Sequence, residues 1–470
     1  MTPTAVVVGG SIAGLATALA LGDAGWRVEV LERAAPPEGD AHRPTVPQAR
    51  HSHTLTSAGF GVLRERAPDV VGACLAAGAP FLDLTVALPA GPDGRTSEVD
   101  DDDLVALACR RSTLERMLYR VVSARRLVSI GHGVAVRGLL LDRSRTSAIG
   151  VVTEGGGRIP ADVVVDATGH RAAARSWLTA AGVPVPADLT GPSGLRGFTR
   201  FYRLAGHGWP GPLNRGNAAG DIWDHYAGVL HPGDGGTFSI AFGVLPDDPA
   251  MDALRQPAAF TAVARATPGL GAWLAHGVAT PISPVFAITS PPNLLRGLAT
   301  SPEPPVAGLF PVGDAACVTN PLFGRGMSLA LIQAYQLADL LSAGPAAADQ
   351  GGAAARMAQA LFQPWYEHSV RADEERIARW SAAVHGWPAP ALPATERPTM
   401  RDAARAAATD GTVWRGLVRV LMGLRTPAEV LGDEKLVARI RQAPAPPADP
   451  RPAAPTRAEL VHIVATADGR

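Results

Sequence analysis

Hydrophobic residues at the start of the chain form short runs broken by glycine. Residues 5–8 are β-branched and apolar, a pattern typical of a buried parallel strand. A glycine-rich segment follows at 9–14, and residues 15–21 are predicted to form an Ala/Leu helix. Residues 27–31 then indicate a second strand. The pattern predicts a strand–helix–strand unit at the beginning of the chain.

The hydrophobic pattern changes twice further along. Aromatic and polar residues alternate between 186 and 295, which is typical of a half-buried antiparallel sheet. Residues 353–445 are predicted to be mostly helical, and 443–455 is rich in Pro and Ala. Other predicted helices are 56–66, 70–77, 111–122 and 326–342, and other predicted strands are 134–142, 148–153, 162–166, 198–202, 222–226, 238–242 and 310–312.

Composition excludes several classes of protein. The 470 residues are 47% hydrophobic, enough for a full core, and the net charge of zero gives no electrostatic footprint for nucleic acid or anionic membrane. Three scattered cysteines argue against a disulfide framework or a structural zinc site. The acidic run at 98–103 is interpreted as a solvated turn. Residues 5–22 raise the question of a membrane span, but their glycines favour a nucleotide-binding turn, so we expect a cytoplasmic protein.

The first candidate site is the turn after the first strand. Gly9 and Gly14 match the first and third glycines of the dinucleotide-binding fingerprint, and Ser11 stands at the middle position. Glu32 lies 18 residues beyond Gly14, where a carboxylate accepts hydrogen bonds from ribose hydroxyls. The helix N-terminus would face the phosphates. The arrangement predicts dinucleotide binding, and the alternative is a glycine-rich turn in another kind of α/β protein.

A second candidate site lies some 300 residues later. Asp314 follows the short strand at 310–312, where its carboxylate could bind a ribitol hydroxyl of a flavin. Residues 320–327 form a glycine-containing turn that opens into a helix, and backbone N–H groups there could face the flavin ring. The alternative for this segment is a plain turn at the start of a helix.

Together these motifs resemble the FAD-dependent monooxygenases with the fold of the aromatic hydroxylases, the class A flavoprotein monooxygenases. The segment at 46–55 reads Val-Pro-Gln-Ala-Arg-His-Ser-His-Thr-Leu and resembles a subgroup that includes epoxidases acting on polyketide chains. The segments that carry the family resemblance are 8–15, 46–55, 111–114, 166–169, 311–316 and 320–327.

The resemblance implies an α/β fold with a Rossmann-like FAD-binding domain, an antiparallel-sheet substrate domain and C-terminal helices. The expected FAD-binding domain is discontinuous, and a C-terminal helical region and a tail complete the chain. The expected boundaries are 1–185 with 296–345 for the FAD-binding domain, 186–295 for the substrate domain, 346–442 for the helices and 443–470 for the Pro/Ala-rich segment and tail.

The resemblance also implies residue roles. Glu32 would bind the adenosine ribose, Arg111 would contact the phosphates and Asp314 would bind ribitol. The isoalloxazine ring would lie against Pro321, Gly324 and Gly326, and no side chain is assigned as a nucleophile. The full set of expected cofactor-binding residues is Gly9, Gly10, Ser11, Ala13, Gly14, Glu32, Arg33, Arg111, Gly313, Asp314, Gly324 and Met327.

The implied reaction uses NAD(P)H to reduce FAD, which then transfers oxygen from O₂ through a flavin C4a-hydroperoxide. Family members usually carry Asp-Gly near the second strand end, where this chain has Asp166-Ala167, and the departure bears on the NAD(P)H contact. Hydroxylation of a phenol needs a base, and the sequence identifies none. The expected substrate is an apolar polyketide- or terpenoid-like molecule, either epoxidised or hydroxylated, under a roof of Phe201, Tyr202, Trp209, Trp223 and Tyr226.

Several alternatives stay open beside this hypothesis. An FAD-dependent reductase of an isoprenoid-type substrate would keep the same FAD motifs without oxygen transfer, and a non-redox protein could hold FAD as a structural part. Halogenases share the fold but rely on a lysine near the flavin, whereas Lys435 lies in the C-terminal helices. His42, His51 and His53 invite a metal site, but the rings of the last two would point to opposite faces of a strand. The oligomeric state is left open.

Overall fold

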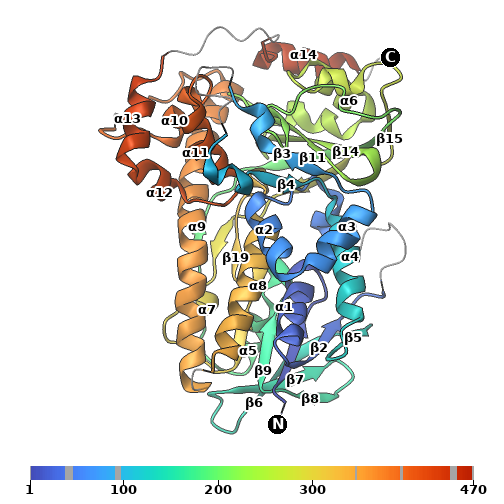
Figure 1. Ribbon diagram of the computed structural model, residues 1–470, viewed down its shortest axis with the longest axis vertical. Coiled ribbons are helices and arrows are strands. Elements are labelled where there is room, and N and C mark those ends of the chain that lie inside the picture. Colours follow the sequence, from blue (N-terminus) through green and yellow to red (C-terminus); the bar gives the residue numbers. More distant parts are fainter. Residues whose placement is uncertain are drawn as a thin grey trace.

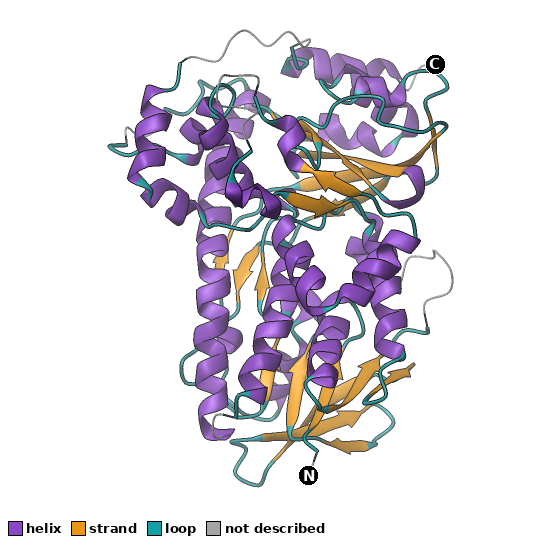
Figure 2. Ribbon diagram, in the orientation of Figure 1, coloured by secondary structure: helices purple, strands orange, loops and turns teal. Residues whose placement is uncertain are grey.

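The computed structural model of the chain describes residues 2–36, 46–89, 97–344, 347–391, 395–444 and 453–467. Figure 1 shows two sheets at opposite ends of an elongated molecule, with one long helix running down a side of it. The N-terminus lies beside the lower sheet, and helices cluster at the upper end (Figures 1 and 2). The candidate active site is built where the loops of the two ends meet.

The lower sheet is parallel and has five strands in the order β18-β9-β1-β2-β5. Its central strand β1 carries three consecutive valines, and β-branched residues suit a strand covered on both faces. The strands are β1 (Thr4–Val8), β2 (Arg27–Glu32), β5 (Val128–His132), β9 (Val163–Asp166) and β18 (Leu309–Pro311). The predicted strand–helix–strand unit at the start of the chain is confirmed.

Alternate residues of β1 enter two different cores, as the period of a strand requires. Ala5 and Val7 pack against helices, whereas Val6 and Val8 pack against a smaller antiparallel sheet and a helix. The helical face comprises α1 (Ile12–Asp23), α2 (Ser57–Arg66), α3 (Pro68–Ala76), α4 (Arg111–Ser123) and α8 (Gly326–Ser342), and the other face comprises β6 (Val136–Leu141), β7 (Ala148–Thr153), β8 (Arg158–Pro160) and α5 (Ala173–Ala180).

The upper sheet is antiparallel, with strand order β12-β13-β14-β11-β15 and β16 paired to β11. Its inner face carries aromatic residues that pack under α6 (Pro257–Ala266) and α14 (Arg457–Ala467). The strands are β11 (Arg196–Leu204), β12 (Ala219–Ile222), β13 (Ala227–Pro232), β14 (Thr237–Val244), β15 (Ala279–Pro281) and β16 (Phe286–Thr289). The predicted change to an antiparallel sheet in the middle of the chain is confirmed.

The long helix α9 (Ala347–His385) spans from one end of the molecule to the other (Figure 1). It packs against α8 and against a three-stranded sheet of β10 (Leu189–Gly191), β17 (Asn293–Leu295) and β19 (Cys317–Val318). The remaining elements are β3 (Phe81–Asp83), β4 (Val105–Leu107), α7 (Gly297–Thr300), α10 (Met400–Ala406), α11 (Gly411–Leu421), α12 (Pro427–Gly432), α13 (Glu434–Gln442) and nine short 3₁₀ turns among the described residues. No helix in the described part of the chain has the length and apolar character of a membrane span.

Two local predictions are wrong. The strand expected at 222–226 is the end of β12 and a turn, because the Trp223 N–H donates to the Tyr226 carbonyl and the two rings stack 4.8 Å apart. The acidic run at 98–103 is more than a solvated turn. Asp101 bonds Arg415 at 2.7 Å and Asp103 lies 3.4 Å from Arg419, so the run anchors α11.

The chain beyond residue 443 also differs from the expected linker and tail. Residues 457–467 form α14, whose Leu460 and Val464 are buried in the core of the antiparallel sheet. The predicted Pro/Ala-rich segment falls partly on 445–452, outside the described residues. Val461, Ile463 and Ala467 pack against the same core while partly exposed, so the apolar pattern of this short helix does not stand out after a proline-rich stretch.

Candidate active site

The glycine-rich turn between β1 and α1 lies against the end of β9. Gly9 has a φ of +111°, and a Cβ there would lie 2.4 Å from the carbonyl oxygen of Ala167. A Cβ on Gly14 would lie 1.8 Å from the carbonyl oxygen of Gly9. Both neighbours are backbone atoms, so no side-chain movement relieves the overlap and only glycine fits. The turn therefore brings the N-terminus of α1, with its free N–H groups, to the edge of the parallel sheet.

Glu32, at the end of β2, holds this turn in place. Its carboxylate accepts the Gly10 N–H and the Ala34 N–H, each at 2.8 Å, and the side chain is 5% exposed. A carboxylate has about four acceptor positions, so a carboxylate at this place can accept from ribose hydroxyls as well as from backbone N–H groups. Arg33 follows Glu32 and is exposed. Burial is the main cause that lowers the pKa of Arg171, and the positive charge of Arg33 is the next largest cause. The role of Glu32 and Arg33 in binding FAD stays a prediction.

Arg111 begins α4 and reaches the N-terminus of α1. Its Nη2 donates to the Ser11 hydroxyl at 3.2 Å, and that hydroxyl donates to Glu115 at 2.7 Å. The Nε of Arg111 is 4.0 Å from the Glu115 carboxylate and is buried without a hydrogen bond among the described residues. A buried guanidinium N–H without an acceptor, beside a helix N-terminus, suits an anionic ligand such as a phosphate.

The second motif lies directly against the first. Gly313, at φ +60°, has no room for a side chain, because a Cβ would lie 2.8 Å from the Cβ of Ala13 on α1. Buried Gln333 of α8 fixes this loop by accepting the Gly313 N–H at 2.8 Å and donating to the Pro311 carbonyl at 3.0 Å. The structure thus brings together two predicted sites that are about 300 residues apart in sequence.

Asp314 projects from this junction as a half-buried carboxylate. Burial raises its pKa, and the positive charges of Arg111, His170 and Arg296 oppose that rise. Among the described residues no hydrogen bond to its side chain is found, although a buried carboxylate ordinarily has donors. A carboxylate that lies near positive charges but accepts no hydrogen bond from the described residues suits a ligand that supplies hydroxyl groups.

These observations test whether the site fits FAD. The unsatisfied Nε of Arg111 suits the pyrophosphate, and the undonated carboxylate of Asp314 suits the ribitol. Gly9 and Gly14 keep the turn tight against the chain's own backbone, as a nucleotide-binding turn requires. The residues present fit the cofactor that the sequence predicts, and its polar contacts with Glu32, Arg111 and Asp314 stay a prediction.

The expected flavin-facing turn follows β19. Pro321–Phe323 is a 3₁₀ turn, and Gly324 after it has a left-handed φ of +66°. A Cβ on Gly324 would lie 2.9 Å from the Cγ2 of Thr54, whereas one on Gly326 would lie 4.0 Å from the Asp314 carboxylate. Gly326 begins α8, and Met327 behind it is buried. The turn therefore lies between Asp314 and the loop that contains His51 and His53.

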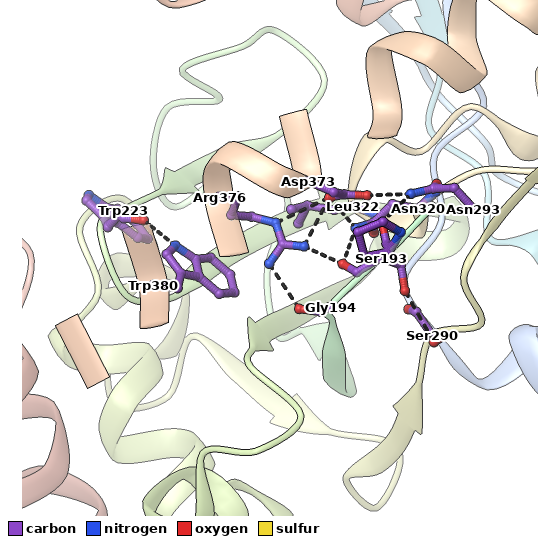
Figure 3. A network of polar contacts seen from close by, with 11 residues as sticks. Ser193, Gly194, Trp223, Ser290, Asn293, Asn320, Leu322, Asp373, Arg376 and Trp380 are labelled. Atoms are coloured by element: carbon purple, nitrogen blue, oxygen red, sulfur yellow. Dashed lines mark hydrogen bonds and ion pairs between the residues drawn. The ribbon is translucent and has the colours of Figure 1, made fainter. Parts of the chain in front are cut away.

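A buried polar network supports this turn from behind (Figure 3). The Asn320 side chain accepts the Leu322 N–H at 2.9 Å and donates to the Asp373 carboxylate at 2.7 Å. Asn293 donates to the same carboxylate at 2.8 Å and accepts the Asn320 N–H at 2.7 Å. The first residue of the turn is consequently fixed from β17 and α9 together.

The network extends along α9 to the antiparallel sheet. Arg376 pairs with Asp373 at 3.0 Å and donates to the carbonyl oxygens of Ser193 and Gly194. One turn further, the Trp380 Nε1–H donates to the Trp223 carbonyl at 2.8 Å (Figure 3). Burial raises the pKa of Asp373 and lowers that of Arg376. The sequence analysis does not predict a role for Asp373 or Arg376. The signal that could have indicated them is a charged pair with i,i+3 spacing on a mostly apolar helix face.

A cavity of about 230 Å³ lies on the side of Arg111 that faces the antiparallel sheet. It lies between the loop at 46–53, the start of α4 and the antiparallel strands, and Arg111 borders both the cavity and Ser11. Its lining residues are Ala49, His51, His53, Arg110, Arg111, Ser112, Phe201, Arg203, His231, Pro232, Gly233, Phe238, Ser239, Ile282 and Ser283.

The predicted aromatic roof is wrong for all but one of its five residues. Only Phe201 lines the cavity. Tyr202 and Tyr226 are buried in the core on the other face of the sheet, Trp223 stacks on Tyr226, and Trp209 is 42% exposed. Along β11 the side chains alternate, so Phe201 and Tyr202 point to opposite faces. The cavity wall therefore combines apolar and polar side chains rather than being lined by aromatics alone.

The histidines at 51 and 53 are also placed differently from the prediction. The segment after the 3₁₀ turn Pro47–Arg50 is irregular rather than a strand, and both rings line the cavity instead of pointing to opposite faces. His42 lies outside the described residues. Within the described ranges no group of three or more His, Cys, Asp or Glu side chains is arranged to hold a metal ion.

Asp166, at the position where the family usually has Asp-Gly, has an internal role. Its buried carboxylate accepts the Thr168 N–H at 2.9 Å, the Thr168 hydroxyl at 2.7 Å and the Ala174 N–H at 2.9 Å. It closes the turn that lies on Gly9. The Asp166 carboxylate therefore fixes the turn after β9, and these hydrogen bonds give no evidence for a contact with NAD(P)H.

Comparisons with known proteins agree with this site. Residues 1–190 match the family described as FAD binding domain. Protein Rv3254 of Mycobacterium tuberculosis is 30% identical over 409 residues, which cover 80% of this chain and 82% of that protein. The chain belongs to the class A family of FAD-dependent monooxygenases and is an oxidoreductase.

Solved structures support the fold. A crystal structure of a probable FAD-dependent monooxygenase, PqsL from Pseudomonas aeruginosa, covers 82% of this chain and 100% of its own, at 17% identity and a TM-score of 0.56. A flavoprotein/dehydrogenase from Cytophaga hutchinsonii covers 94% of this chain and 99% of its own, at 14% identity and a TM-score of 0.61. At these identities the likeness confirms the α/β fold with an FAD-binding domain.

Proposed function

We propose that the chain is a monooxygenase that uses NAD(P)H and O₂ to hydroxylate or epoxidise a small molecule in natural-product biosynthesis. When bound, FAD supplies the redox chemistry, taking electrons from the nicotinamide and passing one oxygen atom of O₂ to the substrate. The reductase alternative is not favoured by the family. The observation that carries the proposal is the position of Arg111, which donates to Ser11 in the nucleotide-binding turn and also lines the cavity.

In this proposal each region of the chain has one task. Residues 1–185 and 296–345 bind FAD, and 186–295 hold the substrate. Arg111 and Asp314 bind the two halves of the cofactor, and the Pro321–Phe323 turn with Gly324 fixes its ring beside the cavity. The substrate has an apolar body, of polyketide or terpenoid type, that lies against Phe201. Closure of the cavity against water protects the oxygen transfer. We also propose that the enzyme acts in the cytoplasm.

The experiment uses the purified protein loaded with FAD. The expected preparation is yellow, and acid precipitation releases the flavin into the supernatant because no covalent attachment is expected. Oxygen uptake should require NADH or NADPH, and the product formed from candidate polyketide or terpenoid intermediates under ¹⁸O₂ should contain one labelled atom. A protein that takes up no FAD, or that turns over the substrate without oxygen, contradicts the proposal.

A further inference from the structure

Three histidines line the cavity, and the loop at 46–53 supplies two of them. His51 is 3.2 Å from the Thr199 hydroxyl through its Nδ1. The Nδ1 of His231 is 3.0 Å from the Ser52 hydroxyl, which lies 2.8 Å from the hydroxyl of Ser239. These two rings are held by hydroxyl groups, which can donate or accept. His53 is held by a different kind of group.

The partner of His53 fixes the position of its proton. Its Nδ1 lies 2.8 Å from the backbone carbonyl oxygen of His51, and a carbonyl oxygen can only accept. The Nδ1 must therefore carry the hydrogen. In a neutral ring the Nε2 is then a lone-pair acceptor. Among the described residues no hydrogen bond to this Nε2 is found, and the ring borders the cavity.

The surroundings of His53 keep the ring neutral. Burial lowers the pKa of His53 to about 3, and the charge of Arg111 is the second cause. The other titratable groups that face it are His51 and His231, whose positive forms would lower its pKa further, and burial lowers the pKa of His231 itself to about 4. No carboxylate is among the groups that shift its pKa most. A ring with this pKa is a poor proton acceptor but remains a good hydrogen-bond acceptor at pH 5–8.

We propose that His53 determines substrate specificity by presenting Nε2 as a neutral hydrogen-bond acceptor to a hydroxyl group of the substrate. The inference rests on the proposed function, because it takes the cavity to be the substrate site. Thr54, the next residue, lies against Gly324 of the expected flavin-facing turn, so the accepted hydroxyl lies at the end of the cavity nearest that turn. The substrate class is an apolar molecule with an uncharged hydroxyl at its reacting end.

The expected discrimination follows from the cost of an unpaired polar atom. A substrate analogue whose hydroxyl is methylated cannot donate, and it leaves the Nε2 buried without a partner. Such a loss costs a factor of roughly 10 to 100 in affinity. An analogue without a donor should bind more weakly even though it is larger and more apolar.

The test compares 2-naphthol with 2-methoxynaphthalene on the FAD-loaded protein by isothermal titration calorimetry. The wild type should bind 2-naphthol roughly 10- to 100-fold more tightly. His53→Phe should bring the two Kd values within about twofold, and His53→Gln, which keeps an acceptor oxygen, should retain part of the preference. His462→Phe, on the exposed face of α14, is the matched control and should keep the full preference. Equal Kd values in the wild type, or no binding of either compound, overturn the proposal.

A second measurement does not require that any variant binds the two probe compounds. With ¹⁵N-labelled histidine, the His53 signals, identified by their loss in His53→Phe, should show the proton on Nδ1 and no titration between pH 8 and pH 5. A proton on Nε2, or a titration in that range, also overturns the proposal. A protein that holds FAD and transfers oxygen but does not discriminate the two probes fails this inference alone. A protein that discriminates them but transfers no oxygen fails the proposed function alone.

Discussion

The nucleotide-binding side and the cavity side of the candidate active site are built in different ways. On the nucleotide side, backbone atoms crowd one another: Gly9 lies on Ala167, and Gly14 lies on Gly9. On the cavity side, the wall is made of side chains from loops and strands that are far apart in sequence. Backbone crowding leaves a signature in consecutive residues, whereas a side-chain wall does not. The nucleotide-binding side should therefore tolerate almost no substitution. Substitutions on the cavity side should change which ligands bind while the fold persists.

The largest effect is expected for Gly14→Val. Its Cβ would lie 1.8 Å from the Gly9 carbonyl, so the turn must move at a cost of about 3 kcal/mol or more, and FAD binding should be lost. The measurement is flavin absorbance per protein after reconstitution, with thermal unfolding alongside. Gly61→Ala in α2 is the control, because no atom lies within 4 Å of its Cβ, and it should be neutral or stabilising. Full FAD content in Gly14→Val would refute the crowding argument.

The second prediction tests the network that joins the two sides. Asp373→Ala leaves Arg376 buried without its carboxylate and should cost about 3–5 kcal/mol in the free energy of unfolding. The exposed pair of Arg66 and Asp339 provides the comparison, and Asp339→Ala should cost under about 1 kcal/mol. Urea unfolding of both variants decides the matter. Equal losses would show that α9 is not held to the turn by this network.

The third prediction separates binding from stability on the nucleotide side. Asp314→Ala should weaken FAD binding by roughly 10- to 150-fold. This factor corresponds to about 1.5–3 kcal/mol, the usual contribution of hydrogen bonds to a carboxylate. The apoprotein should not lose stability, because no protein donor to this carboxylate is found among the described residues. Glu32→Ala should lower both FAD affinity and apoprotein stability, since the Gly10 and Ala34 N–H groups lose their acceptor.

The Asp314 carboxylate also has a pH signature. Burial raises the folded-state pKa of Asp314 above its unfolded value, so folding disfavours its charged form. The contribution of this group to apoprotein stability should rise as the pH falls through the folded pKa, and Asp314→Asn should remove that rise. Apoprotein melting temperatures between pH 7 and pH 4 measure it. A destabilised Asp314→Asn apoprotein, or unchanged FAD affinity in Asp314→Ala, would mean that the cofactor lies elsewhere.

The smallest effect on FAD binding is expected for Gly324→Val. A left-handed φ costs a β-branched residue about 1–2 kcal/mol, and the added Cβ would press on Thr54 at 2.9 Å. FAD should still bind through Arg111 and the glycine-rich turn. Turnover should fall, and more of the NAD(P)H consumed should appear as H₂O₂. The readouts are FAD affinity and the ratio of H₂O₂ to NAD(P)H. Fully coupled oxygenation in this variant would show that the turn does not position the flavin.

The sequence predicts the nucleotide side well for the physical reason given above. Gly9, Gly14 and Gly313 are required by contacts within or between short motifs, so their spacing alone indicates the turn. Gln333 fixes the second motif yet was not predicted, because one glutamine on a helix carries no pattern. The network at Asp373 is not predicted either, because its partners at 193, 293 and 320 are distant in sequence.

The cavity side was predicted only in outline. The alternation around Phe201 indicates a strand, but periodicity does not say which of its two faces borders the site, and the predicted roof combined both. The histidine loop was read as a strand because its residues alternate, whereas it is irregular and directs both rings to one place. The tautomer of His53 depends on a hydrogen bond to a carbonyl two residues earlier, which only coordinates reveal.

The helix α14 makes the last described segment of the chain part of the core of the antiparallel sheet. Arg457 bonds the buried Asp248 at 2.6 Å, and Leu460 with Val464 completes the core over α6. A chain shortened after residue 444 would leave Asp248 without its guanidinium and a strip of apolar surface open to water. Exposed apolar patches of this kind promote association between molecules. Removing α14 to aid crystallisation would therefore produce an aggregating protein.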